Sequence, residues 1–343
     1  MRLILGAITL ATVLITGLMP AAARTASSAS PAGASHAPVQ TCRVTTTIPV
    51  GDGPNGVAVN PKTNIVYVTN SEDDTMAVIN GRTNTVTATV EVGGDFPHAA
   101  AVNPKTNTIY VANGDSNTLS VISGQTETEV TTVRVGKSPA AVAVNPKTNT
   151  IYVANFGNFR VPGTVSVISG QTNAVTATVK VGGAPLALTA ISRTRTIYVA
   201  NLFHTVPVIS GQTNTVTATV NVGGAPEGIA ANPKTNTVYV ATGTTVAVIS
   251  GRDNKVIASV PVSGLNPAAV AVNPRTSTIY VPDEITDKVS LINGRTNTVT
   301  ATVGVGEFPA GVAVNPKTNT AYVTNFSPTP RGNSVSVLSC GKR

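Results

Sequence analysis

Few residues in this chain have the types and spacing that enzymatic chemistry needs. Only two histidines, His98 and His204, follow the first 40 residues, and neither recurs or has a marked third metal ligand. Nucleophile-elbow, P-loop and HExxH motifs are absent. The acid pairs Asp73-Asp74 and Asp283-Glu284 could bind Ca²⁺ or serve glycoside chemistry, but they lack the EF-hand pattern. We expect no catalytic residue, no metal site and no cofactor, with a hydrolase or lyase acting through carboxylates as an alternative.

The first 40 residues carry the pattern of an export signal and a linker. Arg2 precedes an apolar run from Leu3 to Met19, and small residues at 21–23 resemble a cleavage site. We therefore predict a signal peptide over residues 1–23, with an uncleaved signal anchor as the alternative. Residues 24–40 lack apolar periodicity and are predicted to be a disordered linker. The mature chain is expected to be secreted or at the cell surface, with no membrane span.

Composition favours strands and turns over helices. Charged residues make up 11% and aromatic residues 4%, while Val, Thr, Ala, Asn and Gly are abundant. β-Branched side chains suit a pleated sheet, and Asn and Gly suit tight turns. The formal net charge of +8 is compatible with a polyanionic partner.

A repeat of about 42 residues runs through residues 41–343. The turn Asn-Pro-Lys-Thr-Asn or a variant of it occurs seven times, beginning at Asn60, Asn103, Asn145, Ile191, Asn232, Asn273 and Asn315. All seven tyrosines of the chain occupy one repeat position, which indicates a structural layer. A tyrosine ring that binds a ligand is the alternative.

Each repeat contains four strand signals separated by Pro, Gly or Asn turns. In residues 175–181, Val and Ala alternate strictly with Thr and Lys, which predicts one buried and one solvated face. Seven such units predict an all-β, seven-bladed propeller with four antiparallel strands per blade. A solenoid is the alternative.

The ends of the repeat region predict how the ring closes. Residues 41–50 align with a fourth strand, whereas the chain stops after a third strand, so the N-terminal strand should complete the last blade. In the alignment with blade 1, Cys42 and Cys340 fall three residues apart within one hairpin turn. Two cysteines in an exported chain favour a disulfide, and this pair would replace the missing turn.

The segments NPKTNTIYVAN, NPKTNIVYVTN and TVSVISGQTN resemble the YVTN β-propeller family. The resemblance extends over residues 41–343 and departs most in the fourth repeat, where ISRTR replaces the usual turn. It implies a propeller and, because members include surface-layer and other exported proteins, an exported location. It does not specify a function, since propellers host unrelated activities.

The repeat register divides the turns between two faces. The first-to-second and third-to-fourth turns of all blades should share one face, called here the basic face. Its cations include Lys62, Lys105, Lys147, Lys234, Arg275 and Lys317. A merely solvated surface is one interpretation, and binding of nucleic acid or another anionic polymer is the other. Aromatic residues between the cations, which single-strand binding would favour, are missing.

The second-to-third turns and the links between blades should share the opposite face, called the top face. It carries 11 of the 15 acidic residues and two long insertions, residues 156–163 and 326–333. The candidate ligand-binding residues are Phe156, Phe159, Arg160, Phe326, Arg331, Asp52, Asp95, Asp283 and Glu307. Variable loops on a rigid ring are common binding sites, although ordinary loop variation is an alternative.

Together these features favour a non-catalytic recognition module that binds an extracellular glycan or protein through its top face, as a subunit of a cell-surface assembly or alone. Aromatic anchors beside acids suit sugar hydroxyls or a cationic partner. Nucleic-acid or anionic-polymer binding by the basic face is the second hypothesis, and a carboxylate-based hydrolase or lyase is the third.

Overall fold

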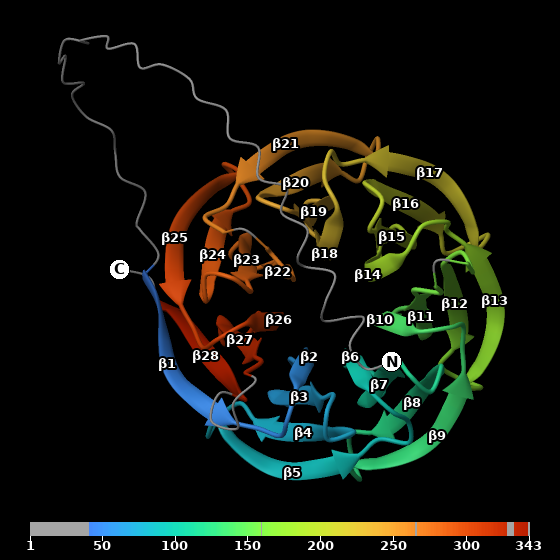
Figure 1. Cartoon of the computed structure of the whole chain (residues 1–343), viewed down its shortest axis with the longest axis horizontal. Helices are drawn as coiled ribbons and strands as arrows, with labels where there is room; N and C mark the ends of the chain where they lie inside the picture. The colour runs from blue at the N-terminus through green and yellow to red at the C-terminus, as the bar shows by residue number, and fades with distance from the viewer. Residues whose placement is uncertain (1–40, 159, 265, 328–332, 342–343) are drawn as a thin grey trace. The chain divides into compact units, whose positions relative to one another are not determined.

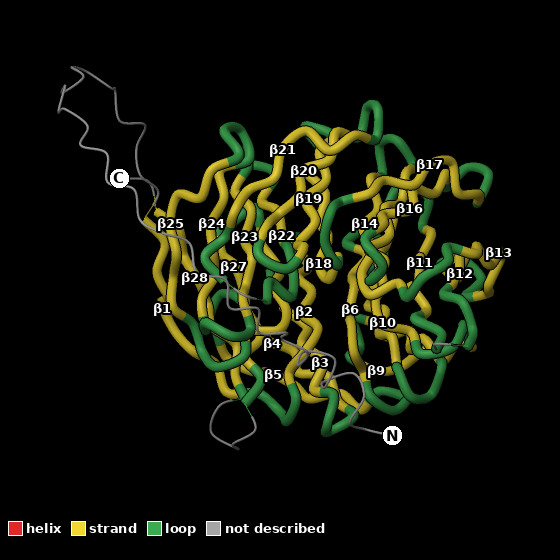
Figure 2. The backbone as a smooth tube through the Cα atoms, turned by 45° about the horizontal axis from the view of Figure 1, so that its top comes forward, coloured by secondary structure: helices red, strands yellow, loops and turns green. Residues whose placement is uncertain are grey.

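The computed structural model describes residues 41–158, 160–264, 266–327 and 333–341. Within them the 28 named elements are all strands, which form seven four-stranded sheets. The sheets stand as blades around a central axis (Figure 1), with turns at both ends of each blade (Figure 2). The predicted seven-bladed propeller is confirmed. The predicted signal peptide and linker lie outside the described residues, as do the candidates Phe159 and Arg331.

In every blade the strands run in order from the axis outward. Blades 1 to 3 comprise β2 (Pro54–Asn60), β3 (Ile65–Asn70), β4 (Thr75–Asn80), β5 (Thr85–Glu91); β6 (Pro97–Asn103), β7 (Thr108–Asn113), β8 (Thr118–Ser123), β9 (Thr128–Arg134); and β10 (Pro139–Asn145), β11 (Thr150–Asn155), β12 (Thr164–Ser169), β13 (Ala174–Lys180). Blades 4 and 5 comprise β14 (Pro185–Ile191), β15 (Thr196–Asn201), β16 (Thr205–Ser210), β17 (Thr215–Asn221); and β18 (Pro226–Asn232), β19 (Thr237–Thr242), β20 (Thr245–Ser250), β21 (Lys255–Pro261). Blades 6 and 7 comprise β22 (Ala271–Asn273), β23 (Thr278–Asp283), β24 (Lys288–Asn293), β25 (Thr298–Gly304); and β26 (Pro309–Asn315), β27 (Thr320–Asn325), β28 (Ser334–Gly341), β1 (Thr41–Pro49).

The two ends of the described chain close the ring inside blade 7. β1 pairs antiparallel with β28, and Cys42 stands directly opposite Cys340 in the register. A disulfide joins the two cysteines, as predicted. The cysteines therefore bridge two paired strands, whereas every other blade joins its third and fourth strands by a covalent turn.

The hydrophobic core lies between neighbouring blades. Seven clusters of buried side chains among the described residues each join two adjacent sheets. One of them, for example, contains Tyr152 and Val165 of blade 3 with Leu188 and Val199 of blade 4. All seven tyrosines are almost fully buried in this layer. The hydroxyl of Tyr198 donates to Oδ1 of Asn254 in the next blade at 2.8 Å. The repeated tyrosine is thus a structural layer residue that ties one blade to the next.

The predicted alternation of the outer strands is wrong at their first residues. Val175 was expected on the buried face with Ala177, but it is 40% exposed. A β-bulge at Thr176 is the cause: Ile168 pairs with Val175 and Val167 with Ala177, so the period of two is interrupted. Thr176 Oγ1 donates to the carbonyl oxygen of Val167 at 3.1 Å and fixes the bulge.

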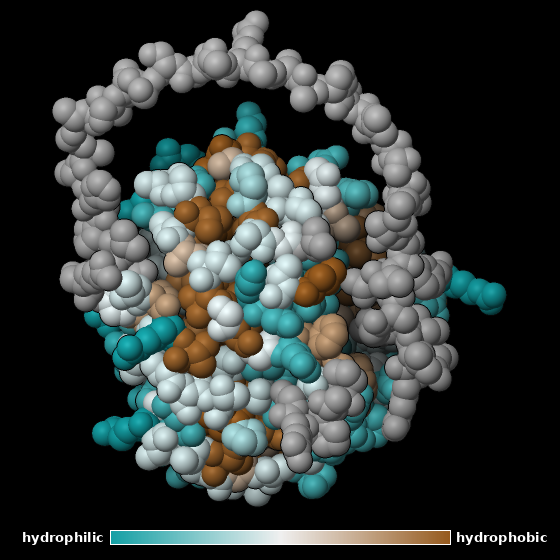
Figure 3. Space-filling view, turned by 60° about the vertical axis from the view of Figure 1, so that its left-hand side comes forward, coloured by the Kyte–Doolittle hydropathy of each residue, from teal (hydrophilic) through white to brown (hydrophobic). Residues whose placement is uncertain are grey.

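The same bulge recurs around the ring and leaves apolar side chains on its outer side. The exposed ones on outer strands are Val86, Val130, Val175, Val216, Val256, Ile257 and Val299. Figure 3 shows apolar surface interspersed with polar surface on the side of the ring that carries β1 and β25.

Hydrogen bonds between turns confirm the division into two faces. On the basic face, the amide of Gly81 in a third-to-fourth turn donates to the carbonyl of Asn64 in a first-to-second turn at 2.9 Å. On the top face, the amide of Phe156 in a second-to-third turn donates to the carbonyl of Ser138 in a blade link at 2.8 Å.

Candidate functional site

Several acids of the top face support the backbone. The amides of Phe96 and Phe308, which adopt positive φ in their blade links, donate to Oδ1 of Asp74 (2.8 Å) and Oδ1 of Asp287 (2.9 Å), respectively. Positive φ strains a residue other than Gly, so a fixed acceptor helps to hold this conformation. These two carboxylates are therefore structural parts of the links.

Asp283 is also occupied by the chain itself. It is 4% exposed, and its Oδ2 accepts a hydrogen bond from the amide of Asn266 at 2.7 Å. Its Oδ1 accepts from the amides of Ile285 and Thr286 and from the Thr286 hydroxyl. A carboxylate with this many donors compensates its burial locally. Ligand binding by Asp283 stays a prediction.

Glu284 and Glu227 form an acidic pair across the boundary of blades 5 and 6. Burial raises the pKa of Glu284 to about 7, and the Glu227 carboxylate adds to the rise. Asn266 Nδ2 donates to Oε2 of Glu284 at 2.8 Å, and this hydrogen bond acts in the opposite direction by lowering the pKa of Glu284. Burial also raises the pKa of Glu227. The alternative of carboxylate catalysis would rest on this pair, because a general acid needs a pKa near the working pH.

Phe326, Glu307 and Asp52 lie together where blade 7 meets its neighbours. Phe326 is half-buried, and its amide donates to the carbonyl of Phe308 at 3.2 Å. Glu307 Oε2 accepts from the Ser327 hydroxyl at 3.0 Å. Asn333, which ends the same insertion, donates through Nδ2 to Oδ1 of Asp52 at 2.8 Å. These acids therefore hold the ends of the blade 7 insertion.

The remaining candidates lie elsewhere on the top face. Asp95 is exposed in the link between blades 1 and 2, where its amide donates to the Ser116 hydroxyl at 2.6 Å. Phe156 and Arg160 belong to the insertion of blade 3, which two blades separate from blade 7 on one side of the ring and three on the other. The structure thus divides the predicted site residues among separate sectors.

Phe156 is buried, which fits the alternative to a ligand anchor, namely that this ring packs its own loop onto the propeller. It is 7% exposed and packs with Ala140, Ala184, Leu186 and Leu202. Its main chain is fixed as well, because its amide bonds the preceding blade link. Truncating Phe156 should therefore cost stability, as for other large core side chains.

A hollow of about 260 Å³ opens beside Phe156, where blade 3 meets blade 4. Its lining comprises Phe156, Asn158, Arg160, Pro162, Gly183, Ala184 and Phe203. Phe203 is 56% exposed and forms an apolar side of the hollow. The Asn158 side chain accepts from the amides of Arg160 and Val161, which shapes the loop. The hollow is a preformed, mostly apolar recess at the rim of the top face.

The charge near this hollow differs from that of the rest of the face. Arg160 is exposed in its lining, and no carboxylate is among the lining residues. Lys137 is also exposed. It lies near the hollow, because its carbonyl oxygen accepts a hydrogen bond from the amide of Gly157 at 2.9 Å. The acids gather in other blades, so this sector is a cationic part of a mainly acidic face.

Sequence reasoning did not pair Phe203 with Phe156. The two residues belong to the second-to-third turns of consecutive blades, and that adjacency was available from the repeat register. The packing that buries one ring and exposes the other was not available, because it depends on Ala184 and Leu202 in three dimensions.

On the basic face the predicted cations are exposed and held on rigid turns. The side chains of Lys62, Lys105, Lys147, Lys234, Arg275 and Lys317 all face solvent. Each of their amides donates to Oδ1 of the asparagine two residues earlier, as in Lys62 to Asn60 at 3.0 Å. This Asx turn fixes where each cation leaves the surface.

The same buried asparagines link the blades. Nδ2 of the first asparagine donates to Oδ1 of the last asparagine in the next blade's turn, in the pairs Asn60–Asn107, Asn103–Asn149, Asn273–Asn319 and Asn315–Asn64. The series of asparagine pairs is interrupted where Ser277 replaces the last asparagine of the turn in blade 6. Nδ2 of Asn232 in blade 5 is therefore buried without a partner in the described structure. The series is interrupted again at Ile191, which replaces the first asparagine of the turn in blade 4. Oδ1 of Asn236, in the turn of the next blade, is buried without a partner in the described structure.

The two histidines have no shared site. The ring Nδ1 of His98 lies 2.8 Å from the carbonyl of Ala140, and burial lowers the pKa of His98. His204 is exposed on another blade. Across the described ranges, no three His, Cys, Asp or Glu side chains form a group that could hold a metal ion. No helix in those ranges is long and apolar enough to cross a membrane.

The sheet order, the repeated tyrosine and the Asx turns define a seven-bladed β-propeller whose repeats are similar to the YVTN type. A family model of YNCE-like beta-propellers matches residues 41–161. The PE-PGRS family protein PE_PGRS18 of Mycobacterium tuberculosis (strain ATCC 25618 / H37Rv) is 71% identical over 34 residues. That match spans 10% of this chain and 7% of the relative's length.

Among solved structures, the Kuenenia stuttgartiensis Hydrazine Synthase is similar in fold. The TM-score is 0.74 with 19% sequence identity, over 83% of this chain and 95% of that chain. At this identity the likeness concerns the architecture alone.

Proposed function

We propose that the propeller is a non-catalytic, extracellular recognition module that binds a protein partner at the hollow between blades 3 and 4. The observation that supports it is the preformed apolar recess beside an exposed Phe203, in a cationic sector of the top face. A hollow of about 260 Å³ suits one bulky side chain of a partner. The Cys42–Cys340 disulfide is compatible with an oxidising location.

The lining indicates the chemistry of the partner. Aromatic, proline and alanine carbons favour an aliphatic or aromatic side chain, whereas Arg160 and Lys137 favour a carboxylate beside it. We therefore propose a partner segment that presents a bulky apolar residue next to Asp or Glu. A rigid recess limits the ordering cost on this side of the interface.

Selection of peptides displayed on phage against the purified chain tests this proposal. Selected peptides should combine a bulky apolar residue with an acid, and Phe203→Ala or Arg160→Glu should weaken their binding at least about tenfold. The matched control is Phe308→Ala, because Phe308 is 48% exposed on the same face but in the link to blade 7. Melting temperatures should stay close to wild type, as for surface substitutions. Binding that survives Phe203→Ala, or is lost equally in Phe308→Ala, would contradict the proposal.

Polyanion binding by the basic face is a second candidate. It is favoured by one observation: six exposed cations leave the same face from turns that Asx bonds hold rigid. Fixed cations on one face can neutralise several phosphates or sulfates of a single polymer and release their counterions.

A further inference from the structure

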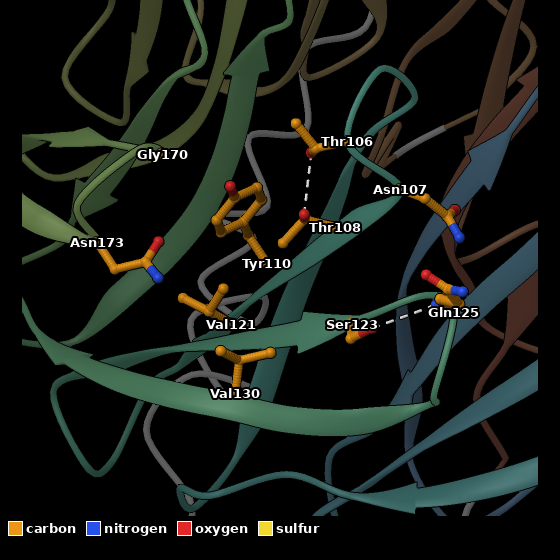
Figure 4. A pocket seen from close by; sticks show the side chains of 10 residues that line it. All are labelled: Thr106, Asn107, Thr108, Tyr110, Val121, Ser123, Gln125, Val130, Gly170 and Asn173. Atoms are coloured by element: carbon orange, nitrogen blue, oxygen red, sulfur yellow. Dashed lines mark hydrogen bonds between the residues drawn. The ribbon is translucent and has the colours of Figure 1, made fainter.

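A groove of about 360 Å³ opens among the turns of blades 2 and 3, away from the top face. Three turns and the strand ends beside them form it. Thr106, Asn107 and Thr108 lie where β7 begins, Ser123 and Gln125 where β8 ends, and Gly170 and Asn173 between β12 and β13. Figure 4 shows Asn173 at one end of the groove and Asn107 and Gln125 at the other. Tyr110, Val121 and Val130 lie between these ends.

The groove carries side-chain amides whose hydrogen-bonding capacity is not used by the protein. Within the described ranges, the side chains of Gln125 and Asn173 make no hydrogen bond to the chain. Asn107 uses Oδ1 to accept from Asn60 at 2.6 Å, which leaves its Nδ2 as a donor. In three other blades the equivalent of Asn173 has Oδ1 buried without a partner, at Asn84, Asn214 and Asn297. At this boundary the amide is instead accessible from a groove.

Two local features shape the groove. The bulge residue of the outer strand is Thr in five blades, where its hydroxyl bonds a carbonyl, as in Thr87 to Val78 at 3.2 Å. In β9 the bulge residue is Val130, which is 61% exposed and presents methyl groups. Gln125 is neutral where blades 1, 5 and 6 have Arg82, Arg252 and Arg295. The groove therefore has an apolar floor and neutral polar ends.

We propose that this groove binds a neutral saccharide of one or two sugar residues. An amide offers both a donor and an acceptor, so it can bond a sugar hydroxyl in either sense. The exposed methyl groups of Val130 suit the C–H face of a pyranose ring. The volume is near the lower end of small-molecule sites, about 300–1,000 Å³. No charged side chain is among the lining residues, which favours a neutral sugar over a sulfated or phosphorylated one.

Amide chemical shifts of the isotope-labelled chain test the proposal, with a panel of neutral disaccharides (cellobiose, maltose, lactose and chitobiose) and one sulfated disaccharide as probes. At least one neutral disaccharide should cause saturable shifts in residues 106–108, 125 and 170–173. Gln125→Ala and Asn173→Gly should each weaken that binding at least about tenfold. Glycine is chosen because Asn173 has φ of 52°, which Gly adopts without strain.

Blade 4 provides matched controls. Gln212→Ala and Asn214→Gly change the equivalent turn positions, and Asn214 also has positive φ, so they should leave binding unchanged. Absence of saturable shifts in the groove with every neutral disaccharide overturns the proposal. Equal loss in the blade 4 variants, or wild-type binding by both groove variants, overturns it as well. Binding of the sulfated sugar alone, weakening steeply with salt, would assign the effect to the lysines.

Discussion

The hydroxyl oxygen of Tyr280 lies 3.3 Å from Sγ of Cys340, inside the core between blades 6 and 7. In other blades the equivalent tyrosine meets the third-to-fourth turn of the next blade: Tyr239, for example, donates to the carbonyl of Gly294 at 3.3 Å. Blade 7 has no such turn, and the disulfide occupies its place. The cross-link therefore replaces the turn both as a connection between strands and as a packing partner.

Replacing Cys42 and Cys340 with Ser should lower the free energy of unfolding by about 2–5 kcal/mol, because the disulfide closes a loop of nearly the whole ring. Urea denaturation measures the change, and the far-UV spectrum of the folded state should stay the same. Mass spectrometry of the non-reduced protein checks the linkage. An unchanged urea midpoint would show that blade 7 closes through β-pairing alone.

Ser277→Asn should stabilise the protein by about 1 kcal/mol, since it offers an acceptor to the buried, unpartnered Nδ2 of Asn232. Asn also tolerates the φ of 58° at this position better than Ser. The expected rise in melting temperature, measured by calorimetry, is about 2 °C for a chain of this size. Ser277→Gly is the control, because it relieves the backbone without supplying an amide. Equal stabilisation by the two variants would show that the hydrogen bond does not contribute to the effect.

Stability should fall as pH rises from about 4.5 to about 7. Glu284 has a pKa of about 7 in the folded state and an ordinary value when unfolded, so the folded state binds the proton more tightly in this window. The stabilisation is complete below the unfolded pKa and is lost as pH passes the folded pKa, with a ceiling of about 3 kcal/mol. The facing groups are Glu227, Asp283 and Asn266.

Glu284→Gln should flatten this part of the stability–pH curve, as determined by denaturation at several pH values. Glu227→Gln should shift the fall to lower pH, because it removes a like charge. An identical pH dependence in wild type and Glu284→Gln would place the titration on another group.

Replacing Lys105, Lys147 and Lys234 together with Gln should weaken any binding of heparin or single-stranded DNA and reduce its dependence on salt. The reason is that each neutralised phosphate or sulfate releases about one counterion. Titrations at several salt concentrations give the slope. Replacing Lys137, Lys180 and Lys288, which lie at the top-face ends of their blades, is the charge-matched control. A slope that changes only in the control would exclude the basic face.

The fold could be predicted because the same local sequence features occur seven times. A Pro-Lys-Thr turn, a tyrosine and a β-branched strand recur at one period, and only a ring of blades buries all seven tyrosines alike. The disulfide followed from the split blade, since the repeat register placed Cys42 and Cys340 in one hairpin. Where the local pattern broke, as at the Thr176 bulge, the alternation alone gave the wrong face for Val175.

The sequence by itself determined the architecture, the closure of the ring and the face on which each turn lies, because these depend on periodicity and register. Only the tertiary structure decided what individual side chains are free to do. It buried Phe156 between two blades, enclosed Asp283 among backbone amides, and left Phe203, Gln125 and Asn173 accessible. The exposure of a side chain and the use of its hydrogen-bonding groups depend on contacts between neighbouring blades. Residues that do not follow the repeat determine these contacts, so the periodicity of the sequence does not predict them.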